Sequence, residues 1–332
     1  MRRFLFAVAY VFLLTAQAPS QKNEIDHECL RRLLSEGQAA WKTVAAATRC
    51  IDVKYDVHQV GQGIVRGKKN SIDRKYRYDC TWDTLHSRIL VERRVDNPPS
   101  ITRRIVNPNY RFFVELLESG SPVLGSAQEI DPPWGPDMIE KELILPLETA
   151  YAIKGVLLEE LISSSDYKPW VVKKIKMPKS EIERIYLEYQ HIGASHPIPV
   201  LKGATYWAYL NPNHYWLIES AGIKQPNQEI DIRQELTYQE SMLGVPFPAT
   251  LKFFFKSKGG KEEDSYTFST PVRSIRPDAE FTLPYYGIPE TVIPKIAQSR
   301  KRTLIISVCV LGLVAAAGLY RLATRYARVK KN

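Results

Sequence analysis

Apolar and polar residues alternate through long stretches of this chain, and this alternation limits the possible folds more than any other feature. In the segment IDVKYDVH, residues 51–58, every second side chain is apolar and the intervening ones are charged or polar. The segment EIDIRQELTYQE, residues 229–240, follows much the same pattern. A period of two places successive side chains on opposite faces of a strand. Each run therefore predicts a strand of an antiparallel sheet with one packed face and one solvated face.

Two segments depart from the alternation and predict helices. They are residues 23–49, where apolar residues recur near helical spacing, and residues 148–164, ETAYAIKGVLLEELISS. Residues 118–136, ESGSPVLGSAQEIDPPWGP, are rich in Gly, Ser and Pro and predict a loop between the halves. We expect a mainly β (α+β) fold, a curved, incomplete antiparallel β-barrel of about 11–12 strands wrapped around two or three helices.

The motif Asn-Pro-Asn occurs twice between aromatic-rich runs, in IVNPNYRFFVEL, residues 105–116, and in YLNPNHYWLIES, residues 209–220. Two interpretations account for this repeat. Either the chain contains two similar halves, residues 23–118 and 145–270, or the motif is simply a favourable turn. In such a turn Pro fixes its own φ and Asn tolerates unusual dihedral angles.

Both ends of the chain predict export and membrane anchoring. Residues 1–20 combine a basic start with an apolar core and small residues, as in a secretory signal peptide. An uncleaved anchor is the alternative. Residues 303–320 carry no charge over eighteen positions, enough to cross a bilayer as a helix, with a buried soluble helix as the alternative. We expect an exported domain (21–294), a basic linker (295–302), this transmembrane helix and a short cytoplasmic tail (321–332).

The formal net charge of +10 belongs to these two ends. Twelve of the 46 basic residues lie in residues 1–22 and 295–332, which contain no acid, so 34 basic residues face 36 acidic ones in between. The charge reflects membrane topology, and we expect no binding to nucleic acid. No Asn-x-Ser/Thr acceptor for glycosylation occurs, which favours a bacterial envelope and a periplasmic location for the exported domain.

Three cysteines lie in the expected exported domain, Cys29, Cys50 and Cys80. In an oxidising compartment they allow one disulfide and one leftover thiol. The alternative is that all three are free thiols buried as small apolar side chains.

Two helices are too few to cover the apolar face of about twelve strands. Part of that face is expected to stay uncovered, as a cavity for an apolar ligand or as a docking surface. The alternative is an ordinary sheet-on-helix core. The aromatic residues that we expect to line this surface are Tyr55, Tyr76, Tyr78, Trp82, Phe112, Tyr206 and Trp216.

The sequence contains no motif of a known catalytic or nucleotide-binding site, such as G-x-S-x-G or a P-loop. His191 and His196 are five residues apart, which fits neither a helical zinc pair nor HExxH. The acids of residues 129–140 are expected to lie in a solvated loop rather than in a glycosidase pair. We therefore expect no metal, no cofactor and no enzymatic activity.

The order of elements, the segment YWAYLNPNHYWLIES (206–220) and the segment FTLPYYGIPE (281–290) resemble a known group of proteins. These are the bacterial carriers that sort outer-membrane lipoproteins and the related periplasmic regulator that senses lipoproteins for an anti-sigma factor. The resemblance covers residues 23–290. It implies an incomplete curved barrel closed by helices, with a hydrophobic cavity between them. Unlike a carrier that shuttles, this chain has its own expected membrane helix.

The resemblance and the expected anchor together lead to one favoured function. The chain would bind a lipid, an acyl chain or a lipoprotein in a hydrophobic cavity, as a tethered sensor or a local carrier. Two alternatives remain, an envelope protein whose sheet docks a partner protein and a hydrolase with an unrecognised site. Fold alone does not decide among them.

Overall fold

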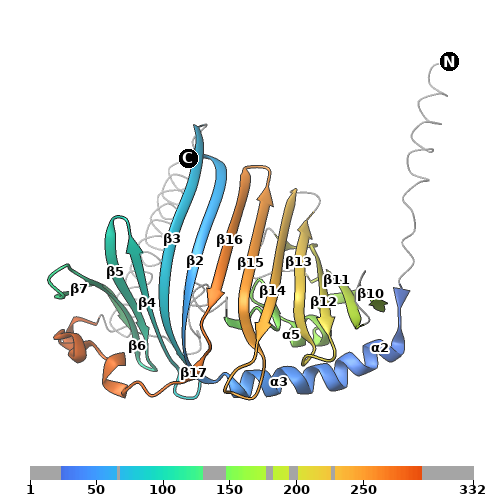
Figure 1. Ribbon diagram of the computed structural model, residues 1–332, viewed down its shortest axis with the longest axis horizontal. Coiled ribbons are helices and arrows are strands. Elements are labelled where there is room, and N and C mark those ends of the chain that lie inside the picture. Colours follow the sequence, from blue (N-terminus) through green and yellow to red (C-terminus); the bar gives the residue numbers. More distant parts are fainter. Residues whose placement is uncertain are drawn as a thin grey trace, which may run out of the picture.

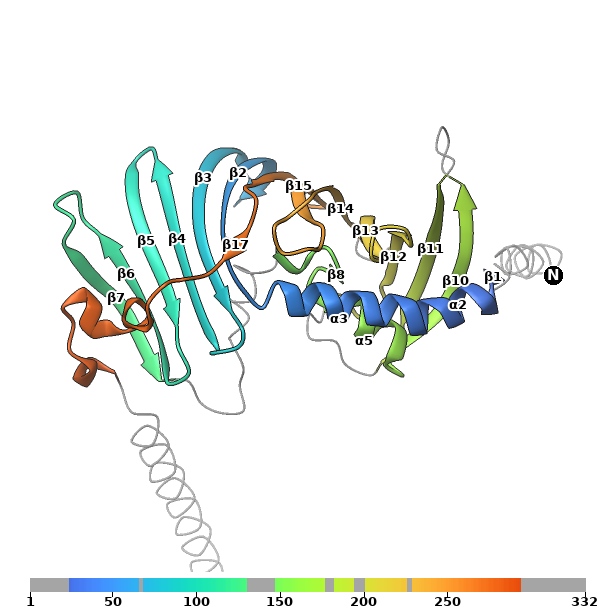
Figure 2. The ribbon, with the colours of Figure 1, turned by 60° about the horizontal axis from the view of Figure 1, so that its bottom comes forward.

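The computed structural model describes residues 24–65, 68–129, 147–176, 182–193, 201–225 and 229–293. Most of these residues belong to one curved sheet of fifteen strands, and a much smaller part forms helices (Figures 1 and 2). The predicted mainly β class is confirmed. The number of strands was underestimated, because four two-residue strands and one strand in a predicted loop were not recognised.

The sheet joins two antiparallel meanders side by side. The first contains β10 (Tyr167–Lys176), β11 (Glu183–His191), β12 (Thr205–Asn211), β13 (Leu217–Gln225), β14 (Ile230–Gln239), β15 (Phe247–Ser257) and β16 (Gly260–Phe268). The second contains β2 (Cys50–Val65), β3 (Lys68–Asp83), β4 (Arg88–Asp96), β5 (Pro99–Val106), β6 (Tyr110–Leu116) and β7 (Pro122–Glu129). Strand β16 pairs with β2 and joins the two meanders. The short β1 (Glu24–Ile25) pairs in parallel with β10, and β17 (Val272–Arg273) pairs with β2. In the described part of the chain β1 and β7 are the two ends of the sheet order, so the barrel is not closed.

A continuous helical segment crosses one face of the sheet, which we call the inner face (Figure 2). It consists of α2 (His27–Arg32), the π-helix η1 (Leu33–Gly37) and α3 (Gln38–Ala47). The Asp26 side chain accepts a hydrogen bond from the Cys29 backbone N–H and caps the start of the segment. Its buried residues are Cys29, Leu33, Gly37, Trp41 and Val44. The first four of these are spaced by four residues, which exceeds the 3.6 residues of an α-helical turn, and the wider π turn keeps them on one face.

The second predicted helix, residues 148–164, is only half correct. Its middle part forms a hairpin of β8 (Ala152–Ile153) and β9 (Val156–Leu157), and only Glu148 and α5 (Leu158–Ser163) are helical within it. The turn residues Lys154 and Gly155 have φ of 48° and 81°. Two successive positive φ angles are those of a tight hairpin turn, which Gly at the second position favours. The predicted loop 118–136 is also partly wrong, because β7 extends the sheet within it.

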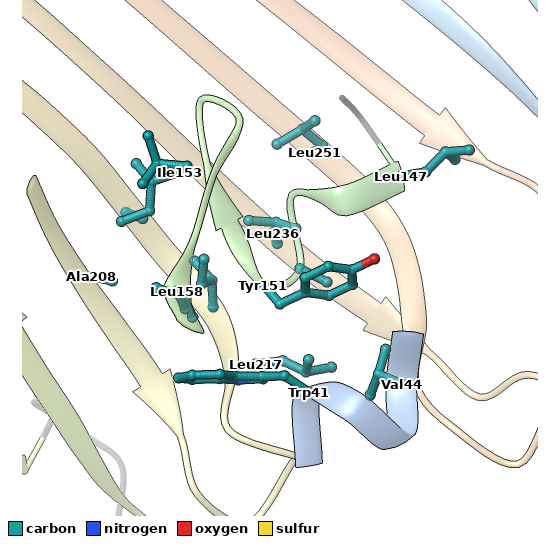
Figure 3. Packing of buried hydrophobic residues seen from close by; sticks show 14 of the residues in the cluster. Trp41, Val44, Leu147, Tyr151, Ile153, Leu158, Ala208, Leu217, Leu236 and Leu251 are labelled. Carbon is teal, nitrogen blue, oxygen red and sulfur yellow. The ribbon is translucent and has the colours of Figure 1, made fainter. Parts of the chain in front are cut away.

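The main core lies between the inner face and the helices. Figure 3 shows Trp41 and Val44 of α3 beside Tyr151 and Leu158, over the strands that carry Leu217 and Leu236. Side chains of β2, β3 and β10 to β16 all contribute to this cluster. Over most strands, the apolar residues of the alternating pattern thus lie on the inner side of the sheet.

A smaller core lies on the opposite, outer face of β4, β5 and β6. The C-terminal segment 269–293, which we call the strap, covers it with the 3-10 helices η4 (Asp278–Phe281), η5 (Leu283–Tyr286) and η6 (Glu290–Val292). Its buried members are Leu90, Ile105, Tyr110, Phe112, Val114, Phe281, Leu283 and Tyr286. The segment FTLPYYGIPE therefore covers the outer face of the sheet.

The two Asn-Pro-Asn motifs begin with the same local turn. The Asn107 side chain accepts hydrogen bonds from the N–H groups of Asn109 and Tyr110, and that of Asn211 accepts one from Asn213. The second loop is longer and contains Tyr215 and Trp216 with positive φ. The two motifs share the hydrogen bonds of the first Asn side chain. The loops differ in length, so the aromatic residues that follow them point in different directions. The division into halves 23–118 and 145–270 stays a prediction.

The predicted signal peptide (1–20) and transmembrane helix (303–320) lie outside the described residues. Within the described part of the chain, no helix combines the length and the apolar character needed to cross a membrane. Both predictions therefore remain untested.

Candidate ligand-binding face

Much of the inner face is filled by the protein itself. Over β10 to β13, Tyr189, Tyr206 and Ala208 are fully buried under the helices. The Trp41 indole N–H donates a hydrogen bond of 2.9 Å to the backbone oxygen of Trp216, and both rings are buried. This part of the sheet is ordinary core and is packed too closely for a ligand.

Over β15, β16 and β3, the inner face instead carries half-buried aromatic side chains. We call this set the aromatic strip; its members are Tyr76, Tyr78, Phe253, Phe255 and Tyr266. Strand register places them on one face, since Tyr78 lies opposite Tyr55 and Tyr266 lies opposite Val57. Half-buried aromatic rings that continue a closed core form a surface suited to an apolar ligand.

Ring contacts hold the strip in place from below. The buried Tyr55 ring stacks on Tyr78 with centroids 4.8 Å apart and lies 6.3 Å from Tyr266. Phe268 lies 5.3 Å from Tyr55 and 6.2 Å from Tyr266. Such contacts restrict the Tyr78 and Tyr266 rings, so this part of the strip is largely pre-formed.

Polar groups border the strip. The Lys154 ammonium, on the β8–β9 turn, lies 4.8 Å from the centroid of Phe253, and the Arg93 guanidinium lies 5.6 Å from that of Tyr76. Asp264 Oδ1 and Arg93 Nε are buried and have no hydrogen-bond partner among the described residues. The polar end of a ligand would therefore lie near the basic groups of Lys154 and Arg93 and near the carboxyl group of Asp264.

Burial raises the pKa of the Asp264 carboxyl to about 6, and the charge of Glu262 adds to the effect. The reference value is 3.8, so between these values the folded chain binds more protons than the unfolded chain. Stability should then fall as pH rises from about 4 to 6. We expect Asp264→Asn to raise the free energy of unfolding by about 1–3 kcal/mol at pH 7.5 and to leave it nearly unchanged at pH 3.5.

Denaturant titrations of wild type and variant at the two pH values check this expectation. Glu263→Gln, at an exposed site on the opposite face of the same strand, is the matched control and should change little at either pH. If Asp264→Asn and Glu263→Gln changed the free energy of unfolding equally, burial would not be the cause of the effect at Asp264.

The structure brings only some of the predicted lining residues together. Tyr55, Tyr76, Tyr78 and Trp82 share the inner face of β2 and β3. Tyr206 and Trp216 belong to the filled part of the core. Phe112 lies on the other face, in the outer core, with its ring 5.6 Å from Tyr286. Their role toward a ligand stays a prediction.

Sequence reasoning missed the part of the strip on β15 and β16. Phe253 and Phe255 occur in LKFFFKSK, where three consecutive Phe residues hide which one faces inward. Tyr266 lies in DSYTFST, whose alternation with Phe268 was visible.

All three cysteines of the described residues are free thiols. Cys29 and Cys80 are fully buried, and Cys50 is partly exposed. Burial raises the pKa of Cys29 to about 11 and that of Cys80 to about 12. These two side chains act as small apolar residues with little thiolate character, which favours the second sequence interpretation.

No group of three or more His, Cys, Asp or Glu within the described ranges could hold a metal ion. His191 is buried against Tyr167, with ring centroids 5.3 Å apart, while His196 lies outside those ranges. A hollow of about 480 Å³ lies near the ends of β14, β15, β16 and β2. Charged residues such as Arg233, Lys256 and Glu263 line it together with the apolar Val60, Phe254 and Phe255.

The chain matches no protein-family model and no curated protein. Similar solved structures include a LolA superfamily protein from Nitrosomonas europaea, with a TM-score of 0.39 and 12% identity over 75% of this chain and 98% of that one. An outer membrane lipoprotein-sorting protein domain from Vibrio parahaemolyticus has a TM-score of 0.37 and 9% identity, over 75% of this chain and 99% of that one. For the MucA/MucB complex of Pseudomonas aeruginosa the TM-score is 0.15 and the identity 9%, over 73% of this chain and 100% of that one. These neighbours match the resemblance seen in the sequence, and the likeness concerns the fold alone.

Proposed function

We propose that this chain is an exported, membrane-tethered binding protein without enzymatic activity. It holds a lipid, an acyl chain or the acyl part of a lipoprotein against the aromatic strip. It acts as a tethered sensor or local carrier on the outer surface of the cytoplasmic membrane. The tether is the apolar segment 303–320, which would keep the chain from shuttling between membranes.

The observation that carries this proposal is the change in packing along the inner face. Helices fill the face over β10 to β13, whereas the aromatic strip on β15, β16 and β3 stays half-buried. The helical segment ends at Ala47, next to the start of β2. Apolar surface left at the margin of a core is a typical binding surface.

The energetics suit a chain-like apolar ligand. Each methylene removed from water contributes about 0.8 kcal/mol, so ten methylenes supply roughly 8 kcal/mol. Association costs at least about 4 kcal/mol in lost freedom of the ligand. The difference, at most about 4 kcal/mol, corresponds to a dissociation constant of about a millimolar or weaker for ten methylenes, so tighter binding requires a longer acyl chain.

Three consecutive phenylalanines provide a matched test. Phe253 and Phe255 face inward with the strip, while Phe254 lies between them on the outer face. We expect Phe253→Ala to weaken binding of a dansyl-labelled fatty acid about tenfold, because the probe loses most of one ring contact. Fluorescence titration of the purified chain measures the dissociation constant.

Phe254→Ala is the control for this titration and should change the dissociation constant less than twofold. Circular dichroism of both variants checks that the fold is retained. Absence of any probe binding by the wild type, or equal losses in the two variants, would overturn the proposed function.

Docking of an envelope protein is the second candidate, and the sheet edge favours it. Strand β7 pairs with β6 on one side, and no described strand pairs with its other side. Such an edge can accept a strand from a partner. This candidate predicts no response to the fatty-acid probe, together with loss of partner binding when a proline is placed in β7.

A further inference from the structure

Exposed apolar side chains are unevenly distributed over the two rims of the sheet. One rim carries the β3–β4, β5–β6, β12–β13 and β14–β15 turns and the start of β2. The helical segment runs along this rim, at the bottom of Figure 1. We call it the helix rim; the opposite rim carries the β4–β5, β6–β7, β13–β14 and β15–β16 turns.

Nine of the fourteen exposed large apolar residues of the described chain belong to the helix rim. The most exposed are Ile275 at 92%, Met242 at 79% and Leu85 at 59%. The others on this rim are Leu34, Ile182, Tyr215, Val272, Tyr285 and Val292. Only Val60, Leu117, Val123 and Ile192 lie toward the opposite rim.

The arrangement of these side chains fits a flat lipid surface better than a protein partner. Leu85, Met242 and Ile275 stand on separate segments, between which polar residues are interspersed. A protein interface needs a contiguous apolar centre that excludes water. A bilayer interface accepts single apolar side chains and tyrosines from several loops at one level.

The length of chain beyond Ile293 gives an independent argument. Nine residues, 294–302, separate it from the apolar run that begins at Thr303, and they span at most about 32 Å. Ile293 packs against the outer core beside Tyr110, at the helix rim. Strand β6, which begins at Tyr110, has seven residues and rises about 24 Å toward the opposite rim, whereas β2, with sixteen residues, rises about 53 Å. The tether therefore starts at the helix rim and leaves the far ends of the long strands β2 and β3 out of its reach.

We propose that the helix rim rests on the bilayer surface, with Met242, Ile275 and Leu85 inserted at headgroup level. This inference rests on the membrane tether of the proposed function and adds an orientation to it. The basic linker, with Lys295, Arg300, Lys301 and Arg302 and no acid, favours a surface of anionic lipid. The aromatic strip would then stand above the membrane with its strands pointing away from it.

Site-specific quenching in the full chain tests the orientation. Met242→Cys and Ile275→Cys report on the helix rim, and Leu117→Cys and Ile192→Cys are matched controls on the opposite rim. Cys50 and Cys309 are first replaced by Ser, while Cys29 and Cys80 are fully buried and stay unlabelled. Each variant is labelled with NBD and reconstituted in vesicles of phosphatidylcholine and phosphatidylglycerol.

We expect doxyl-labelled lipid to quench the two helix-rim labels at least threefold more than the controls, and iodide in the water to show the reverse order. Equal iodide quenching at all four positions would overturn the proposal. Protection of positions 242 and 275 from both quenchers would also overturn it, because protein would then cover the rim. Co-flotation of the chain with the vesicles tests the membrane tether separately, and the fatty-acid titration tests ligand binding.

Discussion

Trp41→Ala is expected to lower the free energy of unfolding by about 3–5 kcal/mol, the range found when a buried large aromatic residue is truncated. Trp41 is 3% exposed and packs between the inner face and the loop that follows β12. Its truncation leaves a cavity and removes the hydrogen bond to the Trp216 backbone oxygen. For a domain of this size, the melting temperature should fall by roughly 5–9 °C.

Two further substitutions separate packing from hydrogen bonding. Trp41→Phe keeps most of the apolar surface but loses the bond to Trp216, and should cost about 1–3 kcal/mol. Trp207→Phe is the control, because the buried Trp207 indole N–H has no hydrogen-bond partner in the described part of the chain. It should be neutral or slightly stabilising. Thermal melts of the three variants check that the loss of stability decreases from Trp41→Ala to Trp41→Phe to Trp207→Phe. If Trp207→Phe lowered the stability as much as Trp41→Phe, the role given to the Trp41 hydrogen bond would be contradicted.

Arg276→Ala is expected to lower the free energy of unfolding by about 2–4 kcal/mol. The guanidinium contacts Asp79 at 2.7 Å, Glu280 at 3.1 Å and Asp52 at 3.6 Å, and so joins β2 and β3 to the strap. Removing it leaves three carboxylates together in a partly buried place. The expected loss is smaller than for a fully buried network, because the Arg276 side chain is 23% exposed.

The effect of Arg276→Ala should be strongest in the strap. Hydrogen exchange is expected to rise first in η4 and η5, which cover the outer core. Arg273→Ala, at an exposed position of the same segment, is the control and should change stability by less than 0.5 kcal/mol. Unchanged exchange in η4 and η5 would show that the outer core alone holds the strap.

The alternation in the sequence was enough to predict the fold class, because a one-sided strand needs a period of two. Val53, Tyr55 and Val57 were assigned to one face, and all three lie in the main core. The first predicted helix also agrees closely with α2, η1 and α3. These features depend on local sequence, where side-chain pattern and backbone geometry are directly linked.

Alternation does not tell which face of the sheet is the inner one, and this limited the prediction of the site. Phe112 has the same pattern as Tyr55, yet it faces outward because the strap covers the outer side of β6. The strap is distant in sequence, so its position could not be derived from the strand. Trp216 was predicted to line the uncovered face, but it lies in a loop and has a positive φ, and the length of that loop determines where its ring points.

The hairpin β8–β9 shows a different limit. Residues 148–164 contain enough good helix formers to predict a helix, and the pair Lys154-Gly155 was the only sign of a tight turn. In the fold, Gln234 of β14 donates hydrogen bonds to the backbone oxygens of Thr149 and Ala152. This tertiary contact stabilises the non-helical backbone of that segment.

The pairing of β16 with β2 has a consequence for how the protein is made. The Lys54 backbone N–H donates to the Ser269 side chain across 215 positions of sequence. Strand β2 therefore remains without its partner β16 until nearly all of the domain has been synthesised. Contacts this distant slow folding, and a long half-paired strand is prone to aggregation meanwhile. A chaperone that shields β2 until β16 is available would reduce this risk.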